Sequence, residues 1–446
     1  MTPEFVPYDF KWRLHHSIPF VIILYIILLF RKRYPLNNWN LSDETLTMTQ
    51  CNTSSAHPSV PFFVSLNSSS VFKDSVHVLD QYQTDVNRII TSLTTSYHEA
   101  IRTEQILFDQ KGQNYKYRLS SAIESRISHI AQILEYDKFI LEKLLRPFPI
   151  TFGLPSPDDE EFSVICDDLR VHLHPPSHVD LPNDHPAYDS GAQIIAHITR
   201  DWTTLGRPIR KSLYEFCILQ LLIHRKGNGG SNVLVPGAGL GRLTKDIFDL
   251  GFHVEGNEIS TTMASAAFHL LHGLVEGVIH PFAFDFLMNE VVSRDRYEEI
   301  PFPDHEMVYS THIITNESSQ PLGSLSYTVG DFIKTYSPKR RSNTFDAVVT
   351  CFFIDTASNV YEYILVVHHV LKDARGIWIN VGPLQWHANS KLRPAADELR
   401  LIIEAMGFSI VHWGVDKETM SYRNDDEVRY TKYEGYKPLR FVAIKK

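Results

Sequence analysis

Two stretches in the first third of the chain repeat apolar residues at intervals of three or four positions. They are VLDQYQTDVNRIITSLTTSYHEAIRTEQILF and SAIESRISHIAQILEYDKFILEKLL, and neither contains a glycine or a proline. This spacing is typical of amphipathic helices. The pattern therefore predicts a helical N-terminal region from residue 71 to about 145, and a further helical pattern continues it over 191–225.

Two other segments lack such periodicity. Residues 35–70 are rich in Ser, Thr and Asn, which predicts a poorly ordered tether. Residues 147–190 combine several prolines with the acidic run DDEE at 158–161, which predicts a long loop or a partly ordered insertion within the helical region.

Strand-like runs alternate with helical patterns after Gly230. The runs are NVLVPG, FHVEGNE, FDAVVTCFFID and GIWINVG, and helices are expected from Leu240, over 260–275 and over 358–371. Such alternation predicts an α/β domain over 226–446, a doubly wound Rossmann-like sheet with its sites at the carboxyl ends of the strands. The last apolar pieces, FSIVHWGV and LRFVAIKK, are expected to close the sheet as an edge hairpin.

The N-terminal extension, residues 1–70, holds the apolar run IPFVIILYIILLF at 18–30. This run is shorter than the roughly twenty residues that a membrane-crossing helix needs, so it fits a signal-type or interfacial segment better. If it does insert, the basic residues at 31–33 would stay in the cytosol and membrane association would leave the body of the chain there. The alternative is an extension without a membrane role.

Composition narrows the classes of partner and compartment. The net charge of −9 and the pI near 6.2 provide no general attraction for nucleic acid, so we expect a small or peptide-like substrate and no nucleic-acid partner. The four cysteines lie far apart without a CxxC pair, which favours reduced thiols and a cytosolic location, with the nucleus as a further option. The sequence does not determine the oligomeric state; a homodimer is one arrangement it allows.

Histidines do not form a convincing metal site. His172 and His174 lie in the proline-rich segment without an obvious third ligand, and the adjacent His368 and His369 would point in different directions on a helix. We therefore expect no bound metal.

The run VLVPGAGLGR at 233–242 resembles a cofactor loop. Gly237, Gly239 and Gly241 fall where a buried strand must turn tightly into a helix, and glycine lets the main chain approach a ligand closely. A dinucleotide fingerprint would need Gly or Ala at position 242, which is Arg242. The spacing instead resembles the S-adenosylmethionine loop of class I methyltransferases.

Two acidic positions support the same cofactor. Glu258 ends the run HVEGNE about twenty residues after the first glycine, where nucleotide-binding sheets place a carboxylate on ribose hydroxyls. Asp331 and Phe332 could hold and cover the adenine. The alternatives are a solvated strand end for Glu258 and a helix N-cap for Asp331. Taken together, the order of these residues favours a methyltransferase over a hydride-transfer enzyme.

A longer set of motifs is similar to the carnosine N-methyltransferase family from about residue 72 to the end. The motifs are HITRDWTTLGRP, LVPGAGLGRL, GNE, GDF, TCFFIDTASNV and GIWINVGPLQWH, in that order. The resemblance implies transfer of a methyl group from S-adenosylmethionine to an imidazole nitrogen of carnosine, β-alanyl-histidine, giving anserine. One alternative is the same reaction on another histidine-containing peptide or on a protein histidine. The other is a noncatalytic protein that binds S-adenosylmethionine.

The resemblance also implies site residues. For the cofactor they are Arg200, Gly237, Glu258, Asp331, Phe332 and Cys351, together with His197, which stands where the family has glutamine. For the substrate they are Asp355, His387 and Tyr436, although Tyr430 and Tyr433 lie close enough to compete for the last role. His387 could accept the proton that methylation releases, and Asp355 could bind the substrate ammonium or orient the imidazole.

Overall fold

The computed structural model describes residues 60–64, 68–111, 119–148, 190–225, 230–283, 290–306, 323–373 and 375–446. The chain divides into a unit of residues 1–56, which lies outside the described residues, and a unit of residues 57–446. The predicted apolar segment at 18–30, most of the tether, and the proline-rich segment with His172 and His174 also lie outside them. No helix in the described ranges is long and apolar enough to cross a membrane.

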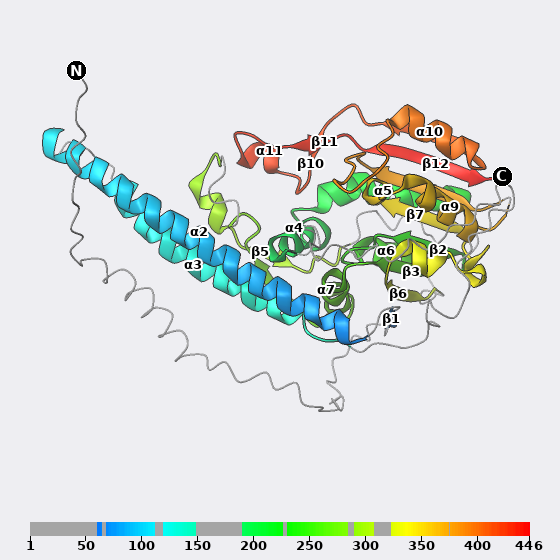
Figure 1. The fold of residues 1–446 in the computed structure, drawn as a ribbon, viewed down its shortest axis with the longest axis horizontal. Helices are drawn as coiled ribbons and strands as arrows, with labels where there is room; N and C mark the ends of the chain where they lie inside the picture. The colour runs from blue at the N-terminus through cyan, green and yellow to red at the C-terminus, as the bar shows by residue number, and fades with distance from the viewer. Residues whose placement is uncertain are drawn as a thin grey trace, which may run out of the picture. The chain divides into compact units, whose positions relative to one another are not determined.

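An eight-stranded sheet forms the centre of the second unit (Figure 1). Its order is β1-β6-β3-β2-β7-β8-β12-β9, and the first six strands run parallel, whereas β12 and β9 run antiparallel to their neighbours. The strands are β1 (Phe62–Val64), β2 (Asn232–Pro236), β3 (His253–Glu258), β6 (Leu325–Val329), β7 (Ala347–Cys351), β8 (Ile377–Gly382), β9 (Phe408–Val415) and β12 (Leu439–Lys445). The predicted doubly wound α/β fold is therefore confirmed.

Helices cover both faces of this sheet because its central strands are apolar on both sides. In β2, Val233 and Val235 pack into one buried cluster and Leu234 into the other, as alternating side chains of a strand must. The first cluster includes residues of α4 (Gly191–Trp202), α5 (Arg207–His224), α6 (Arg242–Phe248) and α7 (Thr261–Leu271). The second includes residues of α8 (Phe332–Tyr336), α9 (Val360–Val370) and α10 (Ala396–Ala405).

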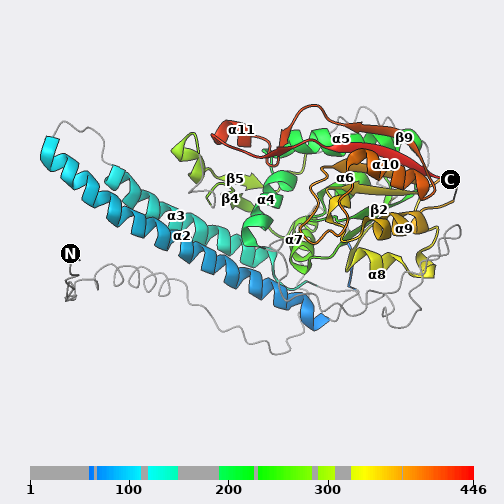
Figure 2. The ribbon, with the colours of Figure 1, turned by 45° about the horizontal axis from the view of Figure 1, so that its top comes forward.

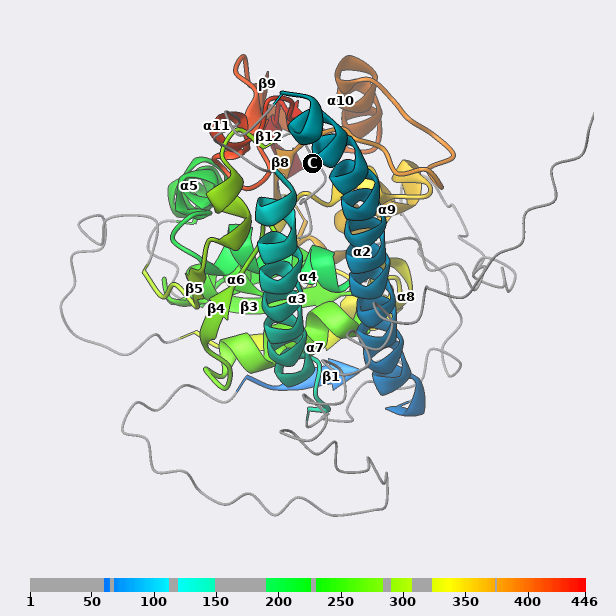
Figure 3. The ribbon, with the colours of Figure 1, turned by 90° about the vertical axis from the view of Figure 1, so that its left-hand side faces the viewer.

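The predicted N-terminal helices form a long antiparallel pair, α2 (Ser68–Lys111) and α3 (Leu119–Leu144), which lie side by side in Figures 1 and 2. Their lower ends pack on α7 (Figure 3). A buried pair also fixes α3, because Asp137 lies 2.8 Å from the Nδ1 atom of His280, directly after β4 (Gly277–Ile279), which pairs with β5 (Ile300–Phe302). The helical region is thus anchored to the sheet domain.

The fold differs from the sequence-based expectation in several elements. Residues 62–64, expected to belong to the tether, form β1 and pair with β6. Neither β6 nor α10 was predicted. The C-terminal strands do pair at the sheet edge, but not as a simple hairpin, because residues 416–438 between them carry β10 (Met420–Ser421), α11 (Asp426–Arg429) and β11 (Gly435–Tyr436).

Candidate active site

The sheet brings most of the predicted cofactor residues to one edge. The glycine loop follows β2, Glu258 ends β3, Asp331 comes two residues after β6, and Cys351 ends β7. These strands are parallel neighbours, so their carboxyl ends meet at the same side of the sheet. β2 stands where the strand order reverses, which is the usual binding position in such folds.

The glycine loop and Glu258 form one hydrogen-bonded unit. The Gly239 N–H donates to Oε2 of Glu258 over 2.9 Å, and the Ser260 N–H donates to Oε1 over 2.9 Å. Gly237, Gly239 and Gly241 all have positive φ, at 66°, 53° and 78°. A Cβ at Gly237 would lie 2.5 Å from the Phe353 ring, whereas one at Gly239 would meet no atom within 4 Å. The loop therefore leaves open space above Gly239, beside a carboxylate held in a fixed position.

Asp331 and Phe332 have clear structural roles. Asp331 is the N-cap of α8, and its Oδ1 accepts from the Lys334 N–H over 2.8 Å. Phe332 is only 4% exposed and packs edge-on against Phe353 and Tyr363. The N-cap alternative for Asp331 is thus what the structure shows, and contact of either residue with a cofactor stays a prediction.

Arg200, on α4, sits in a buried network of polar side chains. Its Nε and Nη2 atoms donate to the two oxygens of Asp201 over 2.7 and 2.9 Å. Nη2 also lies 3.0 Å from Nδ1 of His197, and Nη1 donates to the Tyr422 hydroxyl over 2.8 Å. Tyr214 donates to the same carboxylate of Asp201. The guanidinium is thereby fixed in orientation on α4.

The groups in this network shift the pKa values of their neighbours. Burial, and then the neighbouring Arg200 charge, lower the pKa of His197 to about 4, so this imidazole is neutral at physiological pH. Burial alone would raise the pKa of Asp201, but the charge and hydrogen bonds of Arg200 outweigh it and the pKa lies below its ordinary value. Arg200 and Asp201 are therefore an ion pair, and His197 adds no charge.

The turn between α4 and α5 holds the Arg200 backbone. Arg210, fully buried, donates through Nη1 to the carbonyls of Arg200 and Thr203 and through Nη2 to Asp304. Gly206 lies so close that a Cβ there would overlap the Arg200 carbonyl. The glycine in the motif TLGRP is thus needed for close packing.

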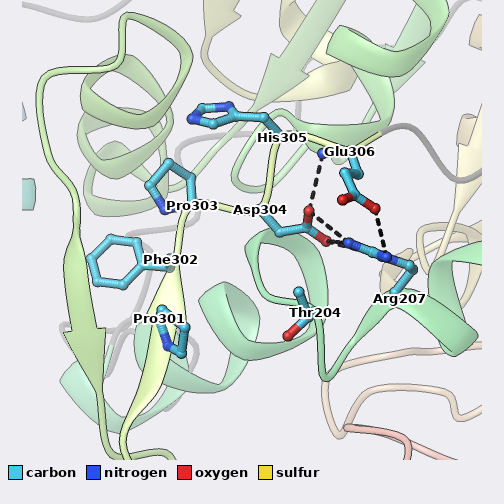
Figure 4. A pocket seen from close by; sticks show the side chains of 8 residues that line it. All are labelled: Thr204, Arg207, Pro301, Phe302, Pro303, Asp304, His305 and Glu306. Carbon is cyan, nitrogen blue, oxygen red and sulfur yellow. Dashed lines mark hydrogen bonds and ion pairs between the residues drawn. The ribbon is translucent and has the colours of Figure 1, made fainter.

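An open cleft of about 450 Å³ is lined by Thr204, Arg207 and residues 301–306 (Figure 4). Arg207 pairs there with Asp304 and Glu306. None of the predicted site residues lines it, so we do not assign it to the reaction.

The end of β7 adds an aromatic residue to the site. Phe352 has a φ of 55°, unusual for a non-glycine residue, and its N–H bonds the Val381 carbonyl. Its ring centroid lies 4.9 Å from the Arg200 guanidinium carbon and 5.2 Å from that of Tyr436. Beside it, burial raises the pKa of the Cys351 thiol to about 12, so this thiol is neutral at physiological pH, and its contact with a cofactor stays a prediction.

One backbone hydrogen bond links His387 to Asp355, and the backbone N–H of Gln385 holds the Asp355 carboxylate. The His387 N–H donates to the Asp355 carbonyl over 3.1 Å, and the Gln385 N–H donates to Oδ2 of Asp355 over 3.0 Å. Burial raises the pKa of Asp355 to about 6 and lowers the pKa of His387. Asp355 therefore protonates at a higher pH than an ordinary aspartate, and burial favours the neutral form of His387.

Tyr436 is the C-terminal tyrosine that lies at this site. Its ring packs on Phe352, and its buried hydroxyl makes no hydrogen bond within the described part of the chain. Tyr430 instead packs toward Phe282, and the exposed Tyr433 donates to Glu427. Of the three tyrosines, Tyr436 is thus the one that packs on Phe352, and its contact with a substrate stays a prediction.

Three residues of the network were not found from the sequence: Asp201, Tyr214 and Tyr422. Asp201 adjoins Arg200 in the motif TRDW, and a buried arginine needs a carboxylate partner, so this neighbour could have been suspected. Tyr422 is 222 positions from Arg200 and offered no local signal. Within the described ranges no group of three or more His, Cys, Asp or Glu could hold a metal ion, and His369 lies 3.2 Å from the Pro338 carbonyl.

The family model and the similar proteins all point to one family. A family model described as carnosine N-methyltransferase matches residues 181–446. The chain is 30% identical to Carnosine N-methyltransferase unmet of Drosophila melanogaster, over 58% of this chain and 57% of that protein. It is 29% identical to the Carnosine N-methyltransferase of Rattus norvegicus, over 79% of this chain and 82% of that protein. A Schizosaccharomyces pombe protein of the same name is 31% identical over 51% of this chain and 65% of that protein.

Proposed function

Because the chain belongs to the carnosine N-methyltransferase family, we propose that it transfers a methyl group from S-adenosylmethionine to an imidazole nitrogen of carnosine, giving anserine. The observation that carries the proposal is the link between Asp355, which follows β7, and His387, which follows β8, at the sheet edge where the glycine loop follows β2 and Glu258 ends β3.

The residues at this edge fit S-adenosylmethionine. Above Gly239 there is open space for a ligand, and Glu258 offers carboxylate oxygens where ribose hydroxyls would lie. Arg200 provides positive charge for a carboxylate, and the neutral Cys351 adds no charge of its own. When bound, this cofactor supplies an electrophilic methyl group on a sulfonium.

The chain's own contribution to the reaction is alignment and proton handling. An imidazole attacks only through a neutral ring nitrogen, so the site has to select one tautomer and hold its lone pair toward the methyl group. His387, uncharged because burial lowers its pKa, can accept a hydrogen bond from the other ring nitrogen and then take its proton. Asp355, whose carbonyl accepts the His387 N–H, provides a carboxylate that can stabilise charge on the acceptor. The Tyr436 hydroxyl has no hydrogen-bond partner among the described residues.

The test is a turnover assay. The full chain is incubated with S-adenosylmethionine and carnosine, and mass spectrometry follows the gain of one methylene on the dipeptide. Anserine as product supports the proposal, and no product with a chain that binds the cofactor would overturn carnosine as the acceptor and turn the search to other histidine-containing peptides.

We extend the proposal to the compartment. Cys217 and Cys351 are free thiols, as expected in the reducing cytosol. A fluorescent fusion of the full chain, compared with one that begins at residue 57, tests both the cytosolic location and any membrane association of residues 18–30. Retention of the full chain at a membrane, with the shortened chain diffuse, would support an anchor.

A further inference from the structure

One N–H group of the Arg200 guanidinium makes no hydrogen bond within the described part of the chain. A guanidinium has five N–H groups, one on Nε and two on each Nη. Nε donates to Asp201, and the two on Nη2 go to Asp201 and His197. One N–H of Nη1 donates to Tyr422. The second N–H of Nη1 has no acceptor among the described residues.

The same arginine determines the tautomer of His197. Arginine can only donate, so Nδ1 of His197, 3.0 Å from Nη2, must present its lone pair. The proton of the neutral ring is therefore on Nε2, which lies 3.3 Å from the Tyr422 oxygen and donates to it. A protonated His197 would turn a second donor toward Arg200, and its pKa of about 4 agrees with the neutral form.

The Tyr422 oxygen thus receives two hydrogen bonds, one from Arg200 and one from His197. A hydroxyl oxygen that accepts from both partners cannot donate its own hydrogen to either, because both present donors. No described residue accepts a hydrogen bond from this hydroxyl. Tyr422 is therefore a donor held in a fixed direction by α4.

We infer that the Tyr422 O–H and the remaining Nη1–H of Arg200 together bind a carboxylate of a bound ligand. Two N–H or O–H donors side by side, one of them on a cation, match the two oxygens of a carboxylate. The rings of Tyr422 and Tyr436 both pack edge-on against Phe352, directly after β7, which places Tyr422 at the candidate site.

The inference rests on the proposed function, because that function provides two ligands with a carboxylate. S-adenosylmethionine carries one on its methionyl part, and carnosine carries one on its histidine. The chemistry recognised is the same for both, and experiment separates them.

The experiment compares the wild-type chain with Tyr422→Phe, which removes the hydroxyl and keeps the ring over Arg200. Calorimetry measures the Kd of S-adenosylmethionine and of the same cofactor without its carboxyl group. Steady-state kinetics measure KM for carnosine and for β-alanyl-histamine, which is carnosine without its carboxyl group. Tyr361→Phe, an exposed tyrosine on α9, makes the same chemical change outside the site and serves as the control.

Loss of a hydrogen bond to a charged group should weaken binding at least about tenfold. A Tyr422→Phe effect on S-adenosylmethionine that disappears with its decarboxylated form assigns the cofactor carboxylate. A rise in KM for carnosine but not for β-alanyl-histamine assigns the acceptor carboxylate. Equal effects on ligands with and without the carboxyl group, or no effect on any, would overturn the inference. Failure of the wild-type chain to bind either ligand would instead overturn the proposed function, and the inference with it.

His197 provides an independent readout. His197→Gln can accept from Arg200 through its amide oxygen and donate to Tyr422 through its amide nitrogen, so the hydroxyl keeps its direction. His197→Leu removes both bonds and lets the hydroxyl rotate. The ligand measured is S-adenosylmethionine or carnosine, whichever the Tyr422→Phe comparison identifies. The leucine variant should bind it several-fold more weakly than the glutamine variant. Equal affinities in the two would contradict a direction set by His197.

Discussion

The Gly239 N–H and the Glu258 carboxylate lie 2.9 Å apart, and this bond ties the loop after β2 to the end of β3. Carboxylate oxygens accept more than one hydrogen bond each, so Glu258 can hold the loop and accept from ribose hydroxyls at once.

Glu258→Ala should weaken S-adenosylmethionine binding by about tenfold to one hundredfold, because it removes charged acceptors from both the loop and the ligand. Glu258→Gln should also weaken it, since its amide nitrogen would face a backbone N–H from Gly239 or Ser260. Calorimetry measures both variants. Unchanged affinity in either one would remove Glu258 from the cofactor site.

His387→Ala should leave the Kd of the cofactor nearly unchanged and lower kcat by about a hundredfold or more, since His387 is expected to act on the acceptor. Single-turnover assays and calorimetry give the two quantities. His98→Ala, an exposed histidine on α2, is the control for histidine removal. An equal loss of cofactor affinity would make His387 a structural residue.

The rate should rise with pH between about 5 and 7 and then level off. Carnosine's imidazole, with an ordinary pKa of about 6.5, has to lose its proton to attack. Asp355 ionises around pH 6, and burial lowers the pKa of His387, which favours its neutral form as the pH rises. All three changes favour the higher pH, so kcat/KM should show one ascending limb. A maximum below pH 6 would contradict this assignment.

Asp355→Asn should stabilise the fold at pH 8 and not at pH 4. Burial raises the pKa of Asp355 from 3.8 to about 6, so its favourable contribution is complete below about pH 4 and is lost as the pH rises through 6. A shift of this size corresponds to at most roughly 3 kcal/mol, or a few degrees in Tm. Calorimetry of both chains at the two pH values measures it. The same Tm difference at both would show that ionisation is not the cause.

Gly206→Ala should lower both Tm and cofactor affinity, because its methyl group would displace the Arg200 carbonyl and with it the guanidinium. Overpacking of this kind costs about 1–3 kcal/mol. Gly414→Ala, where a Cβ would meet nothing within 4 Å, is the matched control and should keep both properties. A Gly206→Ala chain with wild-type affinity would show that the turn does not position Arg200.

The parts of the site that are local in sequence could be predicted. A buried strand, three glycines and a helix lie within residues 232–248, and Glu258 ends the next strand. Because these residues are close in sequence, their order alone predicts how they lie relative to one another. β1 could not be predicted, because a three-residue edge strand has no periodicity and exists only through its pairing with β6.

The Arg200–Tyr422 contact could not be predicted from the sequence either. Its partners stand on α4 and directly after β10, and only the folded sheet brings them together. The role of Asp331 could not be predicted for another reason: an acidic residue before a short helix suits both a cap and a ligand contact. Spacing alone cannot separate those two uses.

The connection between β9 and β12 carries side chains of the candidate site, whereas the strands at its two ends carry the pairing of the sheet edge. Both of its ends are fixed by paired antiparallel strands, while Tyr422 and Tyr436 stand within it. Insertions or exchanges in residues 416–438 can therefore reshape one wall of the site while the loop at 237–241 stays intact. An enzyme engineer who wants to change ligand recognition without rebuilding the sheet would diversify this connection first.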